Sequence, residues 1–427
     1  MTKRKRFWTS LVLFGLIGQV AWVVENMYFN VFIYNMFSAS ASDISLMVLA
    51  SSVIATLTTI FIGALSDKLG RRRLFLSAGY ILWGISILLF AFVRQDIIGK
   101  LFPTAVSVSA IAITVTIILD CLMTFFGSTA NDAAFNAWLT DVTEEKSRGA
   151  VEGVNAMMPL VAILAVFGGF MSFDLALPSS WTIIFIVIGA VVVIAGVLGI
   201  FLVEEPAHGK SEEGYFKTVL YSFRPRTVRE NPLLYLTLLS FAVFGISIQI
   251  FMPYLIIYYE VALGMTDYVF VMAPAILLAS VATVFYGRVY DRVGFVRSAL
   301  PAIGILAIGY VILIFTRTTI PVFLGSLLMM TGYLSGMAVF GAMIRDKIPK
   351  GKAGAFQGIR IVGQVLIPGI IGPAIGAWVL RDAEVMIGGD GTESFIPNAS
   401  IFTAALVVAA FAAGAVLLTK AARKGRS

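Results

Sequence analysis

Ionisable side chains stand inside two long apolar segments in the first half of the chain, where they are costly to bury in hydrocarbon. The segment at about 7–37 contains Glu25, and the segment at about 104–139 contains Asp120 and Asp132. A carboxylate in such a position can bind a hydroxyl group, a proton or Na⁺. These three acids are therefore candidates for ion coupling. For Glu25, a structural ion pair is the alternative.

Amide and indole side chains accompany these acids at helical spacing. On a regular α-helix Gln19, Asn26 and Asn30 lie within roughly 40° of one another, and Trp22 borders that stripe. Amides bind hydroxyl groups, and an indole packs against the apolar face of a sugar ring. The pattern is typical of a polyol-binding surface, and Asn136 extends it beside the second acidic segment. Hydrogen bonding between helices is the alternative for the amides.

The composition requires a lipid environment for the elements that carry these residues. Hydrophobic residues make up 59% of the 427 residues and charged residues 13%, and the mean hydropathy is +0.94. Soluble domains average roughly one quarter charged residues, so we predict an all-α membrane protein. The sequence contains no nucleotide-binding loop, metal-ligand cluster or nucleophile arrangement. We therefore predict neither an enzyme nor a cofactor or metal site.

Twelve apolar segments are long enough to cross a membrane. They lie at about 7–37, 44–65, 74–93, 104–139, 149–173, 180–203, 232–259, 269–289, 298–316, 319–344, 353–379 and 401–418. With the N-terminus in the cytoplasm, all but four of the 31 Lys and Arg residues fall on the cytoplasmic side, as the positive-inside rule requires. Because twelve is even, both termini are predicted to be cytoplasmic. The net charge of +7 then needs no nucleic-acid partner.

One long polar stretch divides the chain into similar halves. We predict an N-terminal six-helix bundle over residues 1–203, a cytoplasmic linker over 204–231 and a C-terminal six-helix bundle over 232–427. Within the linker, Tyr215 and Phe223 belong to an apolar set at helical spacing. This pattern indicates an amphipathic helix on the inner leaflet. A plain connector is favoured over a regulatory element.

A short motif stands between the second and third segments of each half. Gly63-Ala-Leu-Ser-Asp67-Lys-Leu-Gly70-Arg71-Arg72-Arg73 is followed in the second half by Gly287-Arg-Val-Tyr-Asp291-Arg-Val-Gly294. Such doubling is typical of a duplicated transporter. A carboxylate there can cap a neighbouring helix or pair with a base, so we predict a cytoplasmic gate. A positive-inside loop without gating is the alternative. The predicted gate residues are Asp67, Arg71, Arg72, Arg148, Asp291 and Arg292.

The doubled motif resembles the loops between helices two and three, and eight and nine, of the major facilitator superfamily. The resemblance spans nearly the whole chain. It implies twelve transmembrane helices in two pseudo-symmetric bundles, with a central cavity between helices one, four, seven and ten. Polar residues of the second half therefore join the predicted substrate site on helices seven and eleven. They are Gln249, Tyr254 and Gln364.

Shorter motifs resemble the glycoside–pentoside–hexuronide symporters of the melibiose-permease type and the sucrose transporters. Asp132-Ala-Ala-Phe-Asn-Ala-Trp138 resembles that family's Asp-x-x-Phe-Trp stretch, whose Asp binds the sugar. The matching register places Gln19 where the family has a sugar-binding Asp. The family's Na⁺ site uses carboxylates on helix two, but residues 44–65 contain no acid. A proton is therefore the predicted coupling ion.

Together these resemblances imply a secondary transporter that moves a sugar or glycoside with a proton by alternating access. We expect a monomer in the cell membrane, with the lipid bilayer as its surroundings. A proton-coupled drug or metabolite exporter is the alternative. The exporters' helix-five Gly-Pro-x-x-Gly-Gly is missing, but Gly372-Pro373-Ala-Ile-Gly376 on helix eleven keeps that alternative open. A membrane sensor would be expected to carry an extra domain, and the sequence has none.

Overall fold

The computed structural model describes residues 3–143, 148–205, 220–348, 353–387 and 392–424. The chain forms two compact units, Met1–Phe216 and Lys217–Ser427. The boundary between them lies within the predicted linker. Residues 206–219 are outside the described part, and with them most of the predicted amphipathic helix. The three predicted domains therefore stay a prediction.

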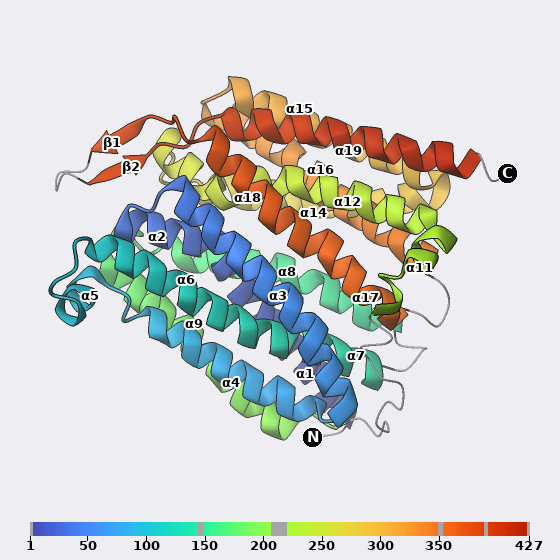
Figure 1. Ribbon diagram of the computed structural model, residues 1–427, viewed down its shortest axis with the longest axis horizontal. Coiled ribbons are helices and arrows are strands. Elements are labelled where there is room, and N and C mark those ends of the chain that lie inside the picture. Colours follow the sequence, from blue (N-terminus) through green and yellow to red (C-terminus); the bar gives the residue numbers. More distant parts are fainter. Residues whose placement is uncertain (1–2, 144–147, 206–219, 349–352, 388–391, 425–427) are drawn as a thin grey trace. The chain divides into compact units, whose positions relative to one another are not determined.

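The regular elements among the described residues of the first unit are all helices (Figure 1). Its elements are α1 (Lys3–Val23), η1 (Val24–Tyr28), α2 (Phe29–Phe37), α3 (Ala41–Leu69), α4 (Arg72–Phe90), α5 (Gln95–Leu101), α6 (Val108–Gly127), η2 (Ser128–Phe135), α7 (Asn136–Val142), α8 (Arg148–Phe170) and α9 (Pro178–Leu202). Two local signals place the start of α3. The Ser40 hydroxyl accepts from the Asp43 N–H while the Asp43 carboxylate accepts from the Ser40 N–H, which forms a capping box.

In the second unit, the regular elements among the described residues are helices and one small two-stranded sheet. Its elements are α11 (Pro225–Glu230), α12 (Pro232–Phe251), η4 (Met252–Tyr254), α13 (Leu255–Ile257), η5 (Tyr258–Ala262), α14 (Val269–Val293), α15 (Phe295–Phe315), α16 (Thr319–Lys347), α17 (Ala353–Ile361), η6 (Val362–Leu366), α18 (Ile367–Val379), β1 (Val385–Ile387), β2 (Glu393–Phe395) and α19 (Ser400–Lys424). The two strands pair antiparallel, with Val385 opposite Phe395. Figure 1 shows this hairpin at one end of α18 and α19.

Eleven helical segments of the described chain are long and apolar enough to cross a membrane. A further apolar helix, Val154–Phe170, lies in the predicted fifth span and is shorter. The chain is thus an all-helical membrane protein in its transmembrane part, as predicted. Twelve crossings and cytoplasmic termini stay predictions.

Small residues let helices of the first unit approach closely. A Cβ added at Gly196 on α9 would lie 2.6 Å from the backbone nitrogen of Ile81 on α4. Lipid provides no hydrophobic driving force between helices, so close backbone packing of this kind replaces it. The opposite side of α9 is apolar and exposed, as Ile194 and Phe201 illustrate. This exposure suits a lipid-facing surface.

Candidate functional site

Four of the apolar spans contain a π-helical segment among their described residues, namely η1, η2, η5 and η6. Each segment carries a polar residue of interest: Glu25, Asp132, Tyr258 and Gln364. A π-helical turn inserts an extra residue, and such turns occur often at functional sites. The sequence analysis predicts regular α-helices at all four places, so these π-helical turns are a local difference from the prediction.

The π-helical turn changes the polar face expected on the first span. Because η1 interrupts the regular helix, the angular positions calculated for a regular helix do not hold beyond Val23. Asn26 is exposed and its side chain donates to the Trp22 carbonyl at 2.8 Å, whereas Asn30 is buried and donates to the Asn26 carbonyl at 3.2 Å. Gln19 lies half-buried on α1. The angles that placed Gln19, Asn26 and Asn30 on one stripe therefore do not apply across η1, and their role in substrate binding stays a prediction.

Two buried carboxylates lie together in the interior of the first unit. The Thr124 hydroxyl donates to Glu25 Oε1 at 2.8 Å, and the Ser51 hydroxyl donates to Asp120 Oδ2. Glu25 also interacts electrostatically with Asp120. The remaining oxygens, Glu25 Oε2 and Asp120 Oδ1, are buried without a hydrogen-bond partner. Buried polar atoms normally have partners, so this pair is suited to receive a proton or a small cation.

The alternative for Glu25, a structural ion pair, finds no support in the described part of the chain. The ion pairs there join other residues, and none includes Glu25, Asp120 or Asp132. Sequence reasoning missed Ser51, which comes from the second span. Its signal was a serine pair within an apolar run.

Asp132 lies in η2, twelve residues after Asp120 along the fourth span. Ser128 donates to Asp132 Oδ2 at 3.0 Å. Glu25 interacts electrostatically with Asp132 as well as with Asp120. Asn136 is exposed, and its amide nitrogen lies 3.2 Å from the carbonyls of Asn131 and Asp132. The fourth span thus brings a second carboxylate to the same interior.

A hydrogen-bond chain fixes the indole of Trp22. Trp22 Nε1 donates to Asn131 Oδ1 at 3.3 Å, and Asn131 Nδ2 donates to the Tyr80 hydroxyl at 2.8 Å. The Tyr80 hydroxyl in turn donates to the Phe14 carbonyl at 2.7 Å. Trp83 lies 5.0 Å from Trp22 between ring centroids, and its Nε1 is buried without a partner. Sequence reasoning missed Tyr80 and Trp83, although both are polar-tipped aromatics within the third span.

The predicted site residues of the second unit lie at helix contacts. Tyr254 is fully buried and its hydroxyl donates to the Pro373 carbonyl on α18 at 3.3 Å. A Cβ added at Gly372 on α18 would lie 2.4 Å from Gln249 Cβ, so Gln249 packs directly on that helix. Gln364 accepts a hydrogen bond from Arg360 at 3.3 Å. Their role in substrate binding stays a prediction.

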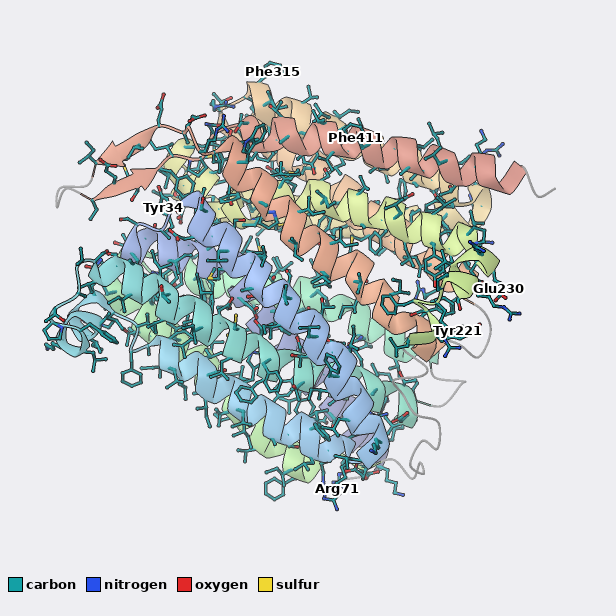
Figure 2. All side chains as sticks on the ribbon, viewed as in Figure 1. Tyr34, Arg71, Tyr221, Glu230, Phe315 and Phe411 are labelled. Carbon is teal, nitrogen blue, oxygen red and sulfur yellow. The ribbon has the colours of Figure 1, made fainter. Side chains whose placement is uncertain are left out.

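The first repeated turn forms a compact ionic contact between three helices. Arg72 is buried at the start of α4, and its Nε lies 3.0 Å from Asp141 Oδ2 at the end of α7. Its Nη1 donates to the Ser66 hydroxyl on α3 at 2.5 Å. Gly70 ends α3 with φ of 62°, a left-handed conformation that glycine adopts without strain. Arg71 is exposed at the opposite end of the unit from Tyr34 (Figure 2).

The second repeated turn uses different partners. Asp291 and Arg292 are exposed, and the Tyr290 hydroxyl donates to Asp346 at the end of α16. The predicted gate residues Asp67 and Arg148 have side chains outside the described part of the structure. Gating by either turn stays a prediction. Both turns nevertheless connect their loop to a carboxylate on another helix of the same unit.

Comparison with known proteins gives the family. Residues 9–373 match the sequence model of the Major Facilitator Superfamily, and the chain belongs to that superfamily. No curated protein matches the sequence. Solved structures share the fold at low sequence identity. A bacterial homologue of the human lysosomal transporter Spinster, inward-facing and unoccupied, has a TM-score of 0.69 and 16% identity, with 98% of each chain covered.

Two further structures share this fold. The nucleoside transporter NupG, solved as a mutant, has a TM-score of 0.74 and 10% identity, with 96% of this chain and 99% of that chain covered. An outward-facing bacterial homologue of the iron transporter ferroportin has a TM-score of 0.62 and 15% identity, with 96% of each chain covered. Family membership indicates a multi-pass membrane transporter of a small molecule, and not an enzyme.

Proposed function

We propose that the chain is a secondary transporter of the cell membrane that takes up a sugar or glycoside together with a proton. The carboxylate pair Glu25 and Asp120 carries this proposal. Each acid has one oxygen held by a hydroxyl and one buried oxygen without a partner. Two unneutralised charges in a water-poor interior are costly. A bound proton removes one charge and provides an O–H donor for the other acid.

Proton binding is preferred to Na⁺ binding for the same pair. Na⁺ needs several oxygen ligands around one centre, whereas the two acids offer one partner-free oxygen each. A proton needs only one acceptor oxygen, which each acid offers. Release of the proton would restore the repulsion between the acids. Proton binding can thereby bias one conformation of the transporter over another.

A sugar or glycoside is supported by the residues next to the pair. Trp22 is oriented by Asn131 and offers an indole face, and Asp132 offers a carboxylate for hydroxyl groups. The resemblance of the Asp132 motif to the melibiose-permease type supports the same class. Nucleosides are N-glycosides, and a nucleoside transporter shares the fold. They therefore belong in the substrate panel.

The test uses purified protein in proteoliposomes, labelled glycosides and nucleosides, and an imposed pH or Na⁺ gradient. We expect uptake that an inward proton gradient drives and a Na⁺ gradient does not. Glu25→Gln and Asp120→Asn should lose accumulation but keep exchange of labelled for unlabelled substrate, because exchange needs no net proton movement. Asp96→Asn, which changes an exposed acid paired with Arg94, is the control.

The possible results test the coupling ion, the carboxylate pair, the substrate class and the direction of transport separately. Uptake driven by Na⁺ alone would exclude the proton. Accumulation by both variants at the control's level would remove the carboxylate pair from coupling. Absence of uptake over the whole panel would contradict the sugar assignment, and efflux driven by the inward proton gradient would favour the exporter.

A further inference from the structure

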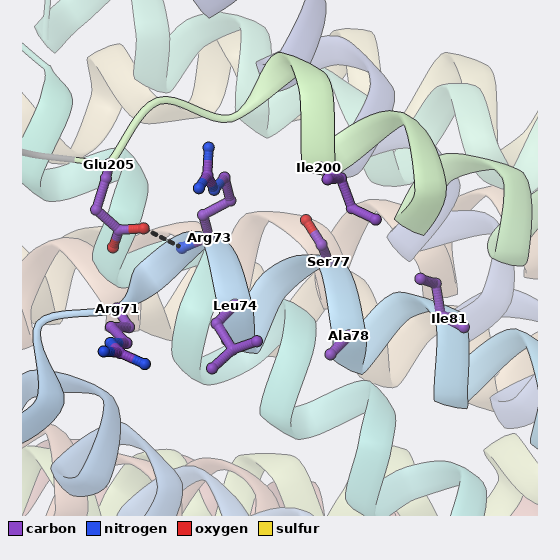
Figure 3. A pocket seen from close by; sticks show the side chains of 8 residues that line it. All are labelled: Arg71, Arg73, Leu74, Ser77, Ala78, Ile81, Ile200 and Glu205. Carbon is purple, nitrogen blue, oxygen red and sulfur yellow. Dashed lines mark hydrogen bonds between the residues drawn. The ribbon is translucent and has the colours of Figure 1, made fainter.

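A pocket outside the carboxylate site opens at the start of α4 (Figure 3). Its volume is about 540 Å³, and it lies between the first turns of α4 and the end of α9. One side of its lining is polar, with Arg71, Arg73 and Glu205. The other side is apolar, with Leu74 and Ile200. A charged end next to an apolar end matches the two parts of a lipid molecule.

We propose that this pocket binds an anionic phospholipid. The phosphate would contact Arg71 and Arg73, and an acyl chain would lie along Leu74 and Ile200. The site uses none of the residues of the carboxylate pair. It is therefore a second binding site that does not depend on which substrate is transported.

Charge favours a phosphate at the polar end. Arg71 and Arg73 are both exposed and contribute two positive charges against the single negative charge of Glu205. The start of α4 adds the positive end of the helix dipole. The chain's own carboxylate already uses this position, because Glu205 Oε2 accepts the Arg73 N–H at 3.3 Å (Figure 3). Glu205 therefore competes with an incoming anion.

A buried polar atom marks the middle of the pocket. Ser77 lines it with a side chain that is 4% exposed, and its hydroxyl has no hydrogen-bond partner. A phosphate oxygen or the glycerol backbone of a lipid would provide that partner. The unpaired hydroxyl is independent of the charge argument and points to a polar ligand group at this depth.

The apolar end distinguishes a lipid from a free phosphate. Leu74 is 53% exposed and Ile200 is 47% exposed, and both lie within apolar spans. Burying such surface against an acyl chain is favourable. Inorganic phosphate would leave it uncovered. The predicted orientation places this pocket in the cytoplasmic leaflet, where anionic lipids attract basic side chains.

The test measures lipid binding to the full-length protein in detergent by native mass spectrometry. Phosphatidylglycerol should bind more tightly than phosphatidylcholine, and inorganic phosphate and glycerol phosphate should not displace it. One Arg near a membrane surface contributes enough to change affinity about fivefold. Arg73→Gln should therefore weaken phosphatidylglycerol binding about fivefold. Glu205→Gln should strengthen it by a similar factor because the competing charge is lost.

Arg229→Gln is the matched control, since Arg229 is an exposed arginine on α11 far along the chain from this pocket. It should leave binding unchanged. Arg71→Gln serves as a second variant if Arg73→Gln does not fold. The proposal is overturned by equal binding in wild type and both arginine variants, by weaker binding in Glu205→Gln, or by displacement with glycerol phosphate. Failure of sugar uptake would leave this result unaffected.

Discussion

Adding one methyl group at Gly18 should break the hydrogen-bond chain that orients Trp22. A Cβ at this position of α1 would lie 2.2 Å from Asn131 Nδ2 and 2.6 Å from the Tyr80 hydroxyl oxygen. Both distances are far below van der Waals contact, so Asn131 must move. The movement breaks the bonds from Trp22 to Asn131 at 3.3 Å and from Asn131 to Tyr80 at 2.8 Å.

The free-energy cost follows from these two bonds. Leaving a buried polar group unpaired costs about 1–3 kcal/mol. At about 1–2 kcal/mol for each of the two lost bonds, the total cost is about 2–4 kcal/mol. Alanine in place of glycine in an unobstructed helix stabilises by about 1 kcal/mol. Gly18→Ala should therefore destabilise the protein by about 1–3 kcal/mol. At about 2–4 °C per kcal/mol for a unit of this size, Tm should fall by about 5 °C.

The assay is thermal denaturation of the purified protein in detergent, followed by tryptophan fluorescence. Gly168→Ala is the matched control, because a Cβ there meets no atom within 4 Å. It should raise Tm slightly. In an Asn131→Ala background, Gly18→Ala should cost much less, since the nearest obstructing atom is gone. A Gly18→Ala variant as stable as the Gly168→Ala variant would refute the reasoning.

Two other stability predictions follow from the first unit. Arg72→Gln should destabilise by about 1.5–3 kcal/mol, because it removes a charged hydrogen bond to Asp141, whose side chain is 23% exposed. Chemical denaturation of Arg72→Gln, of Asp141→Asn and of the double variant checks this, and additive effects would contradict the pairing. Gly196→Ala should lower Tm, since its Cβ would lie 2.6 Å from the Ile81 backbone nitrogen, whereas Gly169→Ala meets no atom within 4 Å. Equal Tm values for these two alanine variants would show that α4 and α9 do not pack as closely as described.

The positions of the spans could be predicted from the sequence because a helix that crosses the hydrocarbon core needs about 20 mainly apolar residues in a row. The segment expected at about 180–203 is the helix Pro178–Leu202, and the one expected at about 269–289 is Val269–Val293. Burial of apolar side chains in lipid depends on composition over about 20 residues. That quantity is visible in the sequence without knowledge of packing.

The local departures from regular helix could not be predicted in the same way. A π-helical turn such as Val24–Tyr28 is five residues long and has no capping residue or hydropathy change that marks it. Asn26 within this turn is exposed, whereas Asn30, four residues later in α2, is buried. The hairpin of β1 and β2 lies in the loop between the last two predicted spans. Its strands have three residues each, which is too short for an alternating pattern to be recognised.

The polar partners of the site also depend on packing between helices. Asp120 and Glu25 were predicted from their charge alone, but Ser51 and Tyr80 gained their roles from neighbours on other helices. The free energy of placing a serine or tyrosine in an apolar span is small compared with that of placing a carboxylate there. Its presence therefore gives a weaker signal in the sequence. Charge identified the centre of the site, and the fold supplied the residues around it.

The two units use different chemistry for their interior polar contacts, and this difference bears on coupling. Glu25 and Asp120 lie in the first unit, whereas hydroxyl pairs recur in the described interior of the second: Tyr259 with Ser326 at 2.5 Å and Tyr310 with Ser247 at 3.2 Å. A phenol keeps its proton near neutral pH, so these tyrosines stabilise packing without exchanging a proton. The proposed proton coupling then belongs to the carboxylates of the first unit. Tyr259→Phe should then alter stability while leaving the dependence of uptake on the proton gradient unchanged.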